Sequence, residues 1–159
     1  MTADIRPASD ADGAAVCALI AAVFTEYPGC VFEISEMPEL LRPCSAYHER
    51  GGAAWVAATG NNVLGFVGAV PAQNGRTELK NLYVAASARG TGLGRLLIAR
   101  VEAFARERGD GAVHLWSDTR FERAHAVYAH CGYERLSGTR ELHDLSNSIE
   151  FHFEKALLI

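Results

Sequence analysis

A glycine-rich stretch between a predicted strand and a predicted long helix constrains the fold of this 159-residue chain most strongly. Residues 77–84 alternate apolar and polar side chains, as a half-buried strand does. After the turn Arg89-Gly90-Thr91-Gly92-Leu93-Gly94, apolar residues recur at helical spacing from Gly92 to Arg108. Val113 to Ser117 is a short run that predicts another strand. A strand, a helix and a strand in this order predict two parallel strands joined by a crossover helix.

The rest of the chain predicts a mixed sheet with helices packed on it. Short strands separated by turn residues precede the glycine-rich stretch and indicate an antiparallel meander. Pro38 and Pro43 interrupt one of the predicted helices. We therefore expect an α/β, or mixed α+β, fold with one domain over residues 1–159 and a mostly antiparallel central sheet. The further elements expected are strands at 3–7, 53–59, 63–70, 134–142 and 148–155 and helices at 10–26, 35–49 and 121–131.

Composition excludes several classes of function. Hydrophobic residues make up 49 % of the chain and charged residues 21 %, which is typical of a folded globular protein. The longest apolar run, Ala14 to Phe24, is too short to cross a bilayer. The formal net charge of −4 argues against general nucleic-acid binding. The four cysteines lack a metal-binding spacing and no secretion signal is present, so we expect a cytoplasmic protein with reduced thiols and no metal.

Positive charge concentrates around the glycine-rich turn. Residues 76–108 carry a net charge of +4, whereas residues 1–75 carry −5 and residues 109–159 carry −3. Glycine lets the backbone approach a ligand closely, and the amides at a helix N-terminus can bind an anion. A dinucleotide motif would need glycine at Arg95, and no Gly-Lys-Ser/Thr triplet occurs, so neither common phosphate motif fits. A tightly packed turn beside a solvated arginine face is the structural alternative.

Three segments, in order, resemble the GCN5-related N-acetyltransferase (GNAT) family. Arg89, Gly92 and Gly94 match its Arg/Gln-x-x-Gly-x-Gly/Ala motif. The preceding stretch Leu79-Lys80-Asn81-Leu82-Tyr83-Val84 resembles the fourth strand of the family, and Ala124-His125-Ala126-Val127-Tyr128 with Cys131-Gly132-Tyr133 resembles its second signature. One departure is Phe121, which stands where the family often has asparagine. The likeness covers residues 77–133 and implies a GNAT-like fold.

The resemblance implies that acetyl-CoA is the cosubstrate. Its pyrophosphate would rest on the amides of the glycine-rich turn. Its pantetheine arm would lie in a gap where the strand at 82–84 splays from its parallel neighbour at 113–117. The Val84 N–H would then polarise the thioester carbonyl. The residues that we expect to bind the cofactor are Leu82, Tyr83, Val84, Arg89, Gly90, Thr91, Gly92, Leu93, Gly94 and Arg95.

The implied reaction is direct attack of a neutral amine on the thioester, which needs a base and an acid. Tyr128 falls where the family places its catalytic tyrosine, so we predict it as the acid; a core aromatic is the alternative. Glu78 begins the strand that leads to the acetyl group, and we predict it as the base, directly or through water. The alternative for Glu78 is a solvent-facing carboxylate paired with an arginine. His114, Ser117 and Asp118 are rival candidates for the base.

The expected acceptor is a primary amine of a small or amino-acid-like molecule. The remaining candidates for its site are pocket walls at Phe24, Tyr27, Phe32 and Tyr47, an acidic mouth at Glu26, Glu33, Glu36 and Glu39, and the polar loop 143–148. Two alternatives stay open: a non-catalytic acyl-CoA-binding module, and a protein or peptide N-acetyltransferase. We expect no nucleic-acid or membrane partner. Exposed edge and tail strands are compatible with a homodimer.

Overall fold

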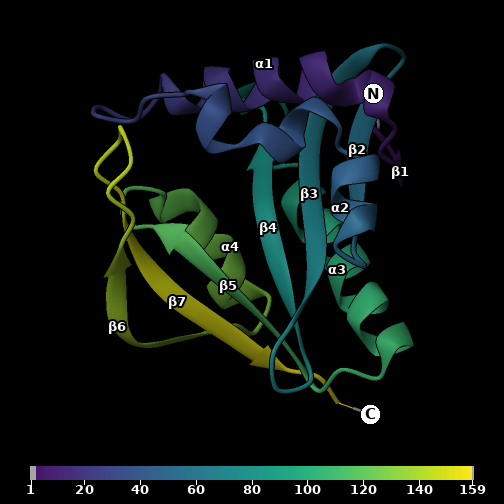
Figure 1. The fold of residues 1–159 in the computed structure, drawn as a ribbon, viewed down its shortest axis with the longest axis vertical. Helices are drawn as coiled ribbons and strands as arrows, with labels where there is room; N and C mark the ends of the chain where they lie inside the picture. The colour runs from purple at the N-terminus through teal and green to yellow at the C-terminus, as the bar shows by residue number, and fades with distance from the viewer. Residues whose placement is uncertain (1–2, 159) are drawn as a thin grey trace.

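A computed structural model describes residues 3–158, which form one mixed seven-stranded sheet with helices on both faces (Figure 1). The strand order is β1-β2-β3-β4-β5-β7-β6. The strands are β1 (Asp4–Pro7), β2 (Ala53–Thr59), β3 (Asn62–Ala72), β4 (Arg76–Val84), β5 (Ala112–Asp118), β6 (Glu134–Glu141) and β7 (Ile149–Ala156). The α-helices are α1 (Gly13–Phe24), α2 (Ser45–Glu49), α3 (Leu93–Arg108) and α4 (Glu122–His130).

The predicted elements are present within a few residues of their expected ends, with one exception. The single helix expected over residues 35–49 is wrong. This segment forms two short 3₁₀ turns, Ile34–Glu36 and Pro38–Leu41, followed by the five-residue helix α2. The two prolines explain the difference, because proline cannot donate the backbone hydrogen bond that a continuous helix needs.

Strands β4 and β5 form the only parallel pair among the described residues, and they pair over a short length. The register joins Arg76 to Ala112 and ends where Glu78 faces His114. Beyond this point the two strands diverge, β4 toward α1 and β5 toward the other half of the sheet (Figure 1). The predicted splayed pair is therefore confirmed, and the mostly antiparallel sheet around it is the one expected.

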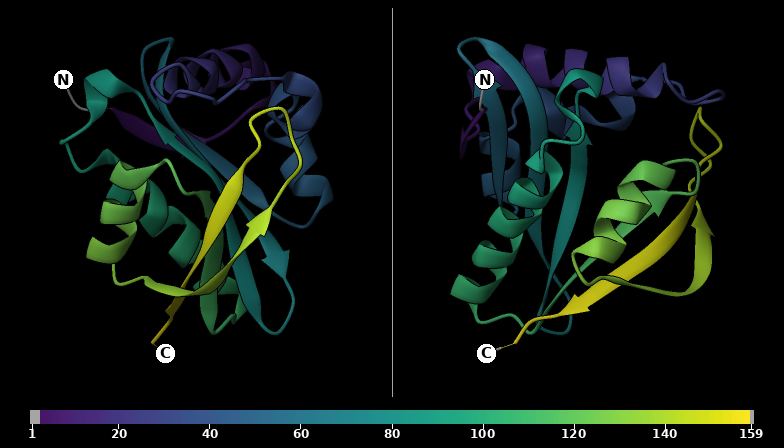
Figure 2. Two further views of the ribbon diagram at one scale, coloured as in Figure 1. Left: turned by 90° about the vertical axis from the view of Figure 1, so that its left-hand side faces the viewer. Right: turned by 180° about the vertical axis from the view of Figure 1, so that it is seen from behind.

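The last strand, β7, lies between β5 and β6, so the chain does not add its strands in sequence order. β7 is antiparallel to both neighbours, with Trp116 opposite His152 and Arg140 opposite Glu150. The loop between β6 and β7 therefore projects from the same end of the sheet at which β4 and β5 diverge (Figure 2).

Two hydrophobic clusters hold the helices to the two faces of the sheet. On one face, α3 packs Leu97, Ile98 and Val101 against β3, β4 and β5, and Tyr128 of α4 joins the same cluster. Both of these helices face the viewer in the right-hand view of Figure 2. On the other face, Ile20 of α1 and its neighbours pack against β2 and β3. Between residues 3 and 158, no helix is long and apolar enough to cross a membrane.

Candidate active site

Strand β4 contains a β-bulge just beyond the end of its pairing with β5. Phe66 of β3 faces Tyr83 and Gly68 faces Lys80, so Val67 alone stands opposite two residues, Asn81 and Leu82. Asn81 adopts the left-handed conformation, with φ of 60°. A bulge with a left-handed first residue bends the strand and increases its local twist. The bulge therefore helps to turn the end of β4 away from β5.

The end of β4 presents free backbone groups on the side from which β5 has separated. The N–H of Ala85 donates to the carbonyl of Leu64 in β3 at 2.8 Å. Because successive residues of an antiparallel strand direct their amides to opposite sides, the N–H groups of Val84 and Leu82 face away from β3. The Val84 carbonyl accepts only a long contact, 3.4 Å, from the Arg89 guanidinium. Leu82, Tyr83 and Val84, three of the residues predicted to bind the cofactor, line the cleft on this side.

The glycine-rich turn forms an open anion cradle at the start of α3. Gly90 and Gly92 have φ of 78° and 84°, a region that residues with a Cβ rarely adopt. No atom lies within 4 Å of the position that a Cβ would take at either glycine. The first amides of a helix have no acceptor inside it, and a sixteen-residue helix adds its dipole. The geometry fits a diphosphate resting on this turn.

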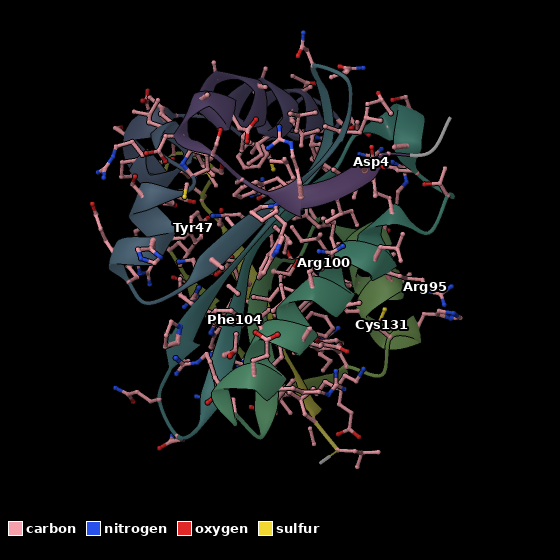
Figure 3. The ribbon with its side chains drawn as sticks, turned by 90° about the vertical axis from the view of Figure 1, so that its right-hand side faces the viewer. Asp4, Tyr47, Arg95, Arg100, Phe104 and Cys131 are labelled. Carbon is pink, nitrogen blue, oxygen red and sulfur yellow. The ribbon has the colours of Figure 1, made fainter. Side chains whose placement is uncertain are left out.

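Side chains of the turn play different parts from its backbone. Leu93 is buried in the core below, so only its main chain can contact a ligand. The Thr91 hydroxyl donates to the Ala88 carbonyl at 2.6 Å and closes the turn. Gly94 faces the cleft, with Val127 of α4 at 3.7 Å from its Cβ position. Arg95 is exposed and lies beside Cys131, where α3 and α4 border an open groove (Figure 3).

Arg89 makes an ion pair across the mouth of the cleft. Its two terminal nitrogens donate to the Glu26 carboxylate at 2.5 and 2.8 Å. Arg123 of α4 reaches the same carboxylate at 3.3 Å. The hydrogen bond from Arg89 lowers the pKa of Glu26, and the same bond raises the pKa of Arg89. Glu26 thus holds two arginines beside the glycine-rich turn rather than contributing to an acidic pocket mouth.

Tyr128 lies in the cleft between the diverging strands. Its side chain is almost fully buried, and it borders the cleft together with Leu82 and Ser117. Burial raises the pKa of its phenol, so the hydroxyl keeps its proton at neutral pH. Among residues 3–158, no side chain or carbonyl forms a hydrogen bond with this hydroxyl. The tyrosine is thus a protonated donor with an uncommitted hydroxyl, as an acid catalyst requires.

A cavity of about 440 Å³ lies on the opposite face of the sheet from α3. Segments from α1, the 30–39 region, β4, β5 and the β6–β7 hairpin meet there. Its charged lining residues are Glu36, Glu39, Glu78, Lys80, Asp118, Arg140, His143, Asp144 and Glu150. Carboxylates outnumber cations in this lining, so the cavity has a negative field.

The cavity adjoins the cleft that holds Tyr128. The residues that line both spaces are Leu79, Asn81, Tyr83, Trp116, Asp118, Phe121 and Glu150. The cavity and the Tyr128 cleft are therefore adjacent spaces, and Leu82, near the end of β4, borders the second of them.

Glu78 and the three other candidates for the base have different surroundings in the structure. Glu78 lines the cavity. His114 stands opposite Glu78 in the strand register, but its side chain is almost fully buried. The Nδ1 atom of His114 lies 3.0 Å from His152 Nε2, and burial lowers the pKa of His114. Asp118 is held by Arg120 at 2.9 and 2.7 Å; burial raises its pKa, but these bonds prevail and the net shift is downward. Ser117 lies 3.0 Å from His125 Nε2.

Trp116 forms a fixed wall of the cavity. Its ring stacks on His152 with centroids 4.2 Å apart and an interplanar angle of 3°. The Arg140 guanidinium covers the ring, with its carbon 4.4 Å from the centroid, and donates to Glu150 at 2.7 Å. Arg140 and Glu150 were not expected at the site. No local signal could have indicated them, because they reach it only through the insertion of β7 beside β5.

Two of the four predicted pocket walls are wrong. Phe24 lines the cavity and Tyr27 lines the cleft, as expected. Phe32 instead packs against the α1 cluster, and Tyr47 is fully buried in it.

The predicted acidic mouth is correct for two of its four glutamates. The predicted polar loop, residues 143–148, does reach the cavity. Glu36 and Glu39 line the cavity, whereas Glu33 accepts the Ser35 N–H at 3.1 Å and belongs to a turn. The cavity-lining residues of the loop are His143, Asp144, Ser146 and Ser148.

Comparison with known proteins identifies the family. A profile described as "Acetyltransferase (GNAT) family" matches residues 18–133, well over half of the chain. The chain therefore belongs to this family of acetyltransferases.

Particular relatives place the chain more closely. N-acetyltransferase 8F1 of Rattus norvegicus is 34 % identical over 95 residues, which are 57 % of this chain and 43 % of that protein. The chain thus spans less than half the length of this curated relative. A GNAT-family acetyltransferase from Staphylococcus aureus superposes with a TM-score of 0.84 at 17 % identity, over 98 % of this chain and 99 % of the other. An aminoglycoside 6′-N-acetyltransferase solved with coenzyme A gives 0.74 at 17 % identity, over 98 % of each chain. These two likenesses confirm the fold.

Proposed function

We propose that this protein transfers the acetyl group of acetyl-CoA to a primary amine of a small or amino-acid-like molecule. One observation carries the proposal: the end of β4, which has no strand partner on its β5 side, lies between the anion cradle at α3 and a carboxylate-lined cavity. Such a path accommodates an anionic head, an amide-containing arm and an acceptor in that order. The aminoglycoside acetyltransferase with a similar fold was solved with coenzyme A, which supports this choice of cosubstrate.

The roles of the residues follow from their positions. The amides at Gly90 to Arg95 would hold the diphosphate, since they begin a long helix and face open space. The outward amides of Leu82 and Val84 would bind the arm as an added strand does. The Val84 N–H would also donate to the thioester oxygen as charge develops there, a contribution of about 3 kcal/mol.

Two side chains would move the protons of the reaction. Glu78 borders the cavity and would accept the proton of the attacking amine, directly or through water. Tyr128 would donate its proton to the departing thiolate, because its phenol remains protonated and uncommitted. The two groups lie on different faces of the sheet, one on each side of the gap where the thioester would lie.

The cavity supports a cationic acceptor. Glu36, Glu39 and Asp144 have no arginine or lysine partner among the described residues, so no cation neutralises their charge. Glu36 accepts the Leu145 N–H, and Asp144 accepts the Ser148 N–H and hydroxyl. A free amine is protonated at neutral pH and would be attracted before it loses its proton. The cavity volume of about 440 Å³ is in the range of small-molecule sites, which supports a small acceptor.

A thiol-release assay tests the function directly. The protein is mixed with acetyl-CoA and a panel of diamines, aminoglycosides, amino acids and lysine peptides, and free thiol is followed. We expect turnover with small cationic amines and reduced turnover for Glu78→Gln. Binding of coenzyme A without turnover on any amine would favour the non-catalytic binding module. Turnover on peptides alone would favour a protein N-acetyltransferase, and absence of coenzyme A binding would refute the proposal.

A further inference from the structure

A tyrosine outside the site reaches the bulge of β4. The side-chain amide of Asn81 donates to the hydroxyl of Tyr47 in α2 at 2.7 Å. Tyr47 is fully buried, in the cluster beneath α1, and lies on the other side of the molecule from Arg95 and Cys131 (Figure 3). No chemistry requires a tyrosine here, and phenylalanine would fill the same space in the core. The only hydrogen bond of the Tyr47 hydroxyl among the described residues is the one that it accepts from Asn81 in the bulge.

The neighbouring strand is shaped to admit the Tyr47 ring. A Cβ at Gly68 of β3 would lie 2.2 Å from the ring, far inside contact distance. Gly68 pairs with Lys80, the residue directly before the bulge. The glycine thus lets the ring cross β3 at the one place from which its hydroxyl reaches Asn81. Three segments that are distant in the sequence meet at this point.

The contact also accounts for the conformation of Asn81. Bulges of this kind commonly place glycine at the left-handed position, because a Cβ is unfavourable there. Asparagine tolerates the left-handed region better than most residues, but it does so more readily when its side chain is hydrogen-bonded. Asn81 borders both the cavity and the Tyr128 cleft, and Leu82 and Val84 follow it immediately. Any change in its backbone would move their amides.

We propose that Tyr47, Gly68 and Asn81 form a positioning unit that holds the β4 bulge, and thereby the Leu82 and Val84 amides, in register for the acyl-CoA arm. Tyr47 is a positioning residue, since it acts on the site only through Asn81. The inference rests on the proposed function, because it assigns the unit a part in binding that cosubstrate. It goes beyond that function because it makes acetyl transfer depend on Tyr47, a core residue beneath α1 that does not line the site.

The variant Tyr47→Phe tests the unit, since it removes only the hydroxyl. We expect kcat/KM for acetyl-CoA to fall about tenfold, in line with the loss of one buried hydrogen bond. Coenzyme A should bind correspondingly more weakly, whereas 3′-phospho-ADP, which lacks the pantetheine arm, should bind as to the wild type. Asn81→Gly keeps the left-handed torsion available but breaks the same bond, and should show the same pattern. The double variant should lose about tenfold, not a hundredfold.

Thr77→Val is the matched control. It removes a buried hydroxyl that donates to Asp110 at 2.7 Å, on the same strand but at the end paired with β5. We expect it to lower the thermal midpoint about as much as Tyr47→Phe and to leave coenzyme A affinity unchanged. Equal coenzyme A affinity in Tyr47→Phe and Thr77→Val would overturn the proposal, as would equal weakening of 3′-phospho-ADP.

The two levels of failure are distinguishable. If the wild type binds no coenzyme A, the proposed function fails; if the wild type binds it and Tyr47→Phe binds it equally well, only the positioning unit fails. Should Tyr47→Phe not fold, Asn81→Gly decides the question, because it leaves the Tyr47 ring in the core.

Discussion

At the scale of single residues, Tyr128 combines two properties that rarely occur together in a protein core. Its ring packs against Tyr133 and Phe153, with centroids 5.9 and 5.6 Å away, while its hydroxyl stays uncommitted. Buried phenols usually find a hydrogen-bond partner, because an unpaired polar group in the core is costly. Among the described residues only His114 Nε2 is a buried side-chain polar atom without a partner, so the Tyr128 hydroxyl does not carry this cost. It borders the cleft instead, where a ligand can reach it.

Tyr128→Phe is therefore expected to lower kcat about 100-fold, the usual contribution of a positioned acid, with little change in coenzyme A affinity. Steady-state kinetics and calorimetry would measure the two quantities. Tyr133→Phe provides the control, because the Tyr133 hydroxyl already donates to Glu102 at 2.9 Å and is not free to act. An unchanged kcat in Tyr128→Phe would show that Tyr128 is a core aromatic residue and not the acid.

Site residues could be predicted from the sequence when they stand in a short motif, and could not when their position depends on distant parts of the chain. Gly92, Gly94 and Tyr128 stand in short motifs. In the structure Gly94 lines the cleft beside Leu82 and Val84, Tyr128 lines the adjoining space between β4 and β5, and Gly92 borders the open groove beside Arg95. Phe32 and Tyr47 were expected in the pocket because they are aromatic and near its acidic residues, yet they point into the core. Composition cannot distinguish these cases, since the direction of each side chain depends on a chain path set by Pro38 and Pro43.

At the scale of elements, the turn before α3 depends on its backbone torsions more than on its side chains. Gly92→Ala would place a Cβ at φ of 84° in open space, so the cost is torsional strain of roughly 1 kcal/mol in unfolding free energy. The new methyl group would also stand over the anion cradle. We expect coenzyme A affinity to fall at least tenfold, measured by calorimetry alongside denaturant unfolding.

Gly75→Ala is the matched control for this prediction. Gly75 has φ of 66°, has no atom within 4 Å of its Cβ position, and lies in the β3–β4 turn. It should lose a similar amount of stability and keep its coenzyme A affinity. If both variants bind coenzyme A equally, the turn before α3 is a packing feature and not a phosphate site.

The elements themselves were largely predictable, whereas their exact pairing was not. Periodicity indicates α3 and the strands because each pattern lies within one segment. The bulge at Asn81 leaves no such trace, and its side chain is hydrogen-bonded to a residue 34 positions earlier in the chain. The place of β7 between β5 and β6 likewise depends on contacts between residues that are distant in the sequence. This strand order brings Arg140 and Glu150 to the cavity.

At the scale of the whole molecule, three histidines link stability to pH. Burial is the main cause that lowers the pKa of His114, His125 and His152. The unfolded chain therefore binds more protons than the folded one as pH falls below about 6.5, the unperturbed value. Stability is fully present above that pH and is lost as pH falls toward the folded pKa values.

We expect the thermal midpoint to decrease between pH 7.5 and pH 5.5 in calorimetric scans. The double variant His114→Gln and His152→Gln should flatten this dependence, because it removes two of the three groups. His48→Gln, which alters an exposed residue of α2, should leave the slope unchanged. Equal slopes in the wild type and the double variant would show that the histidines do not control it.

The position of β7 between β5 and β6 has a consequence for how the molecule is made. During synthesis, β6 leaves the ribosome before the strand it must pair with, and β5 waits with one side unfilled. Trp116 gains its stacking partner and Arg140 its carboxylate only when residues 149–156 arrive. The wall of the cavity that contains Trp116, Arg140 and Glu150 is thus completed only when β7 pairs, whereas the glycine-rich turn and α3 are made well before it.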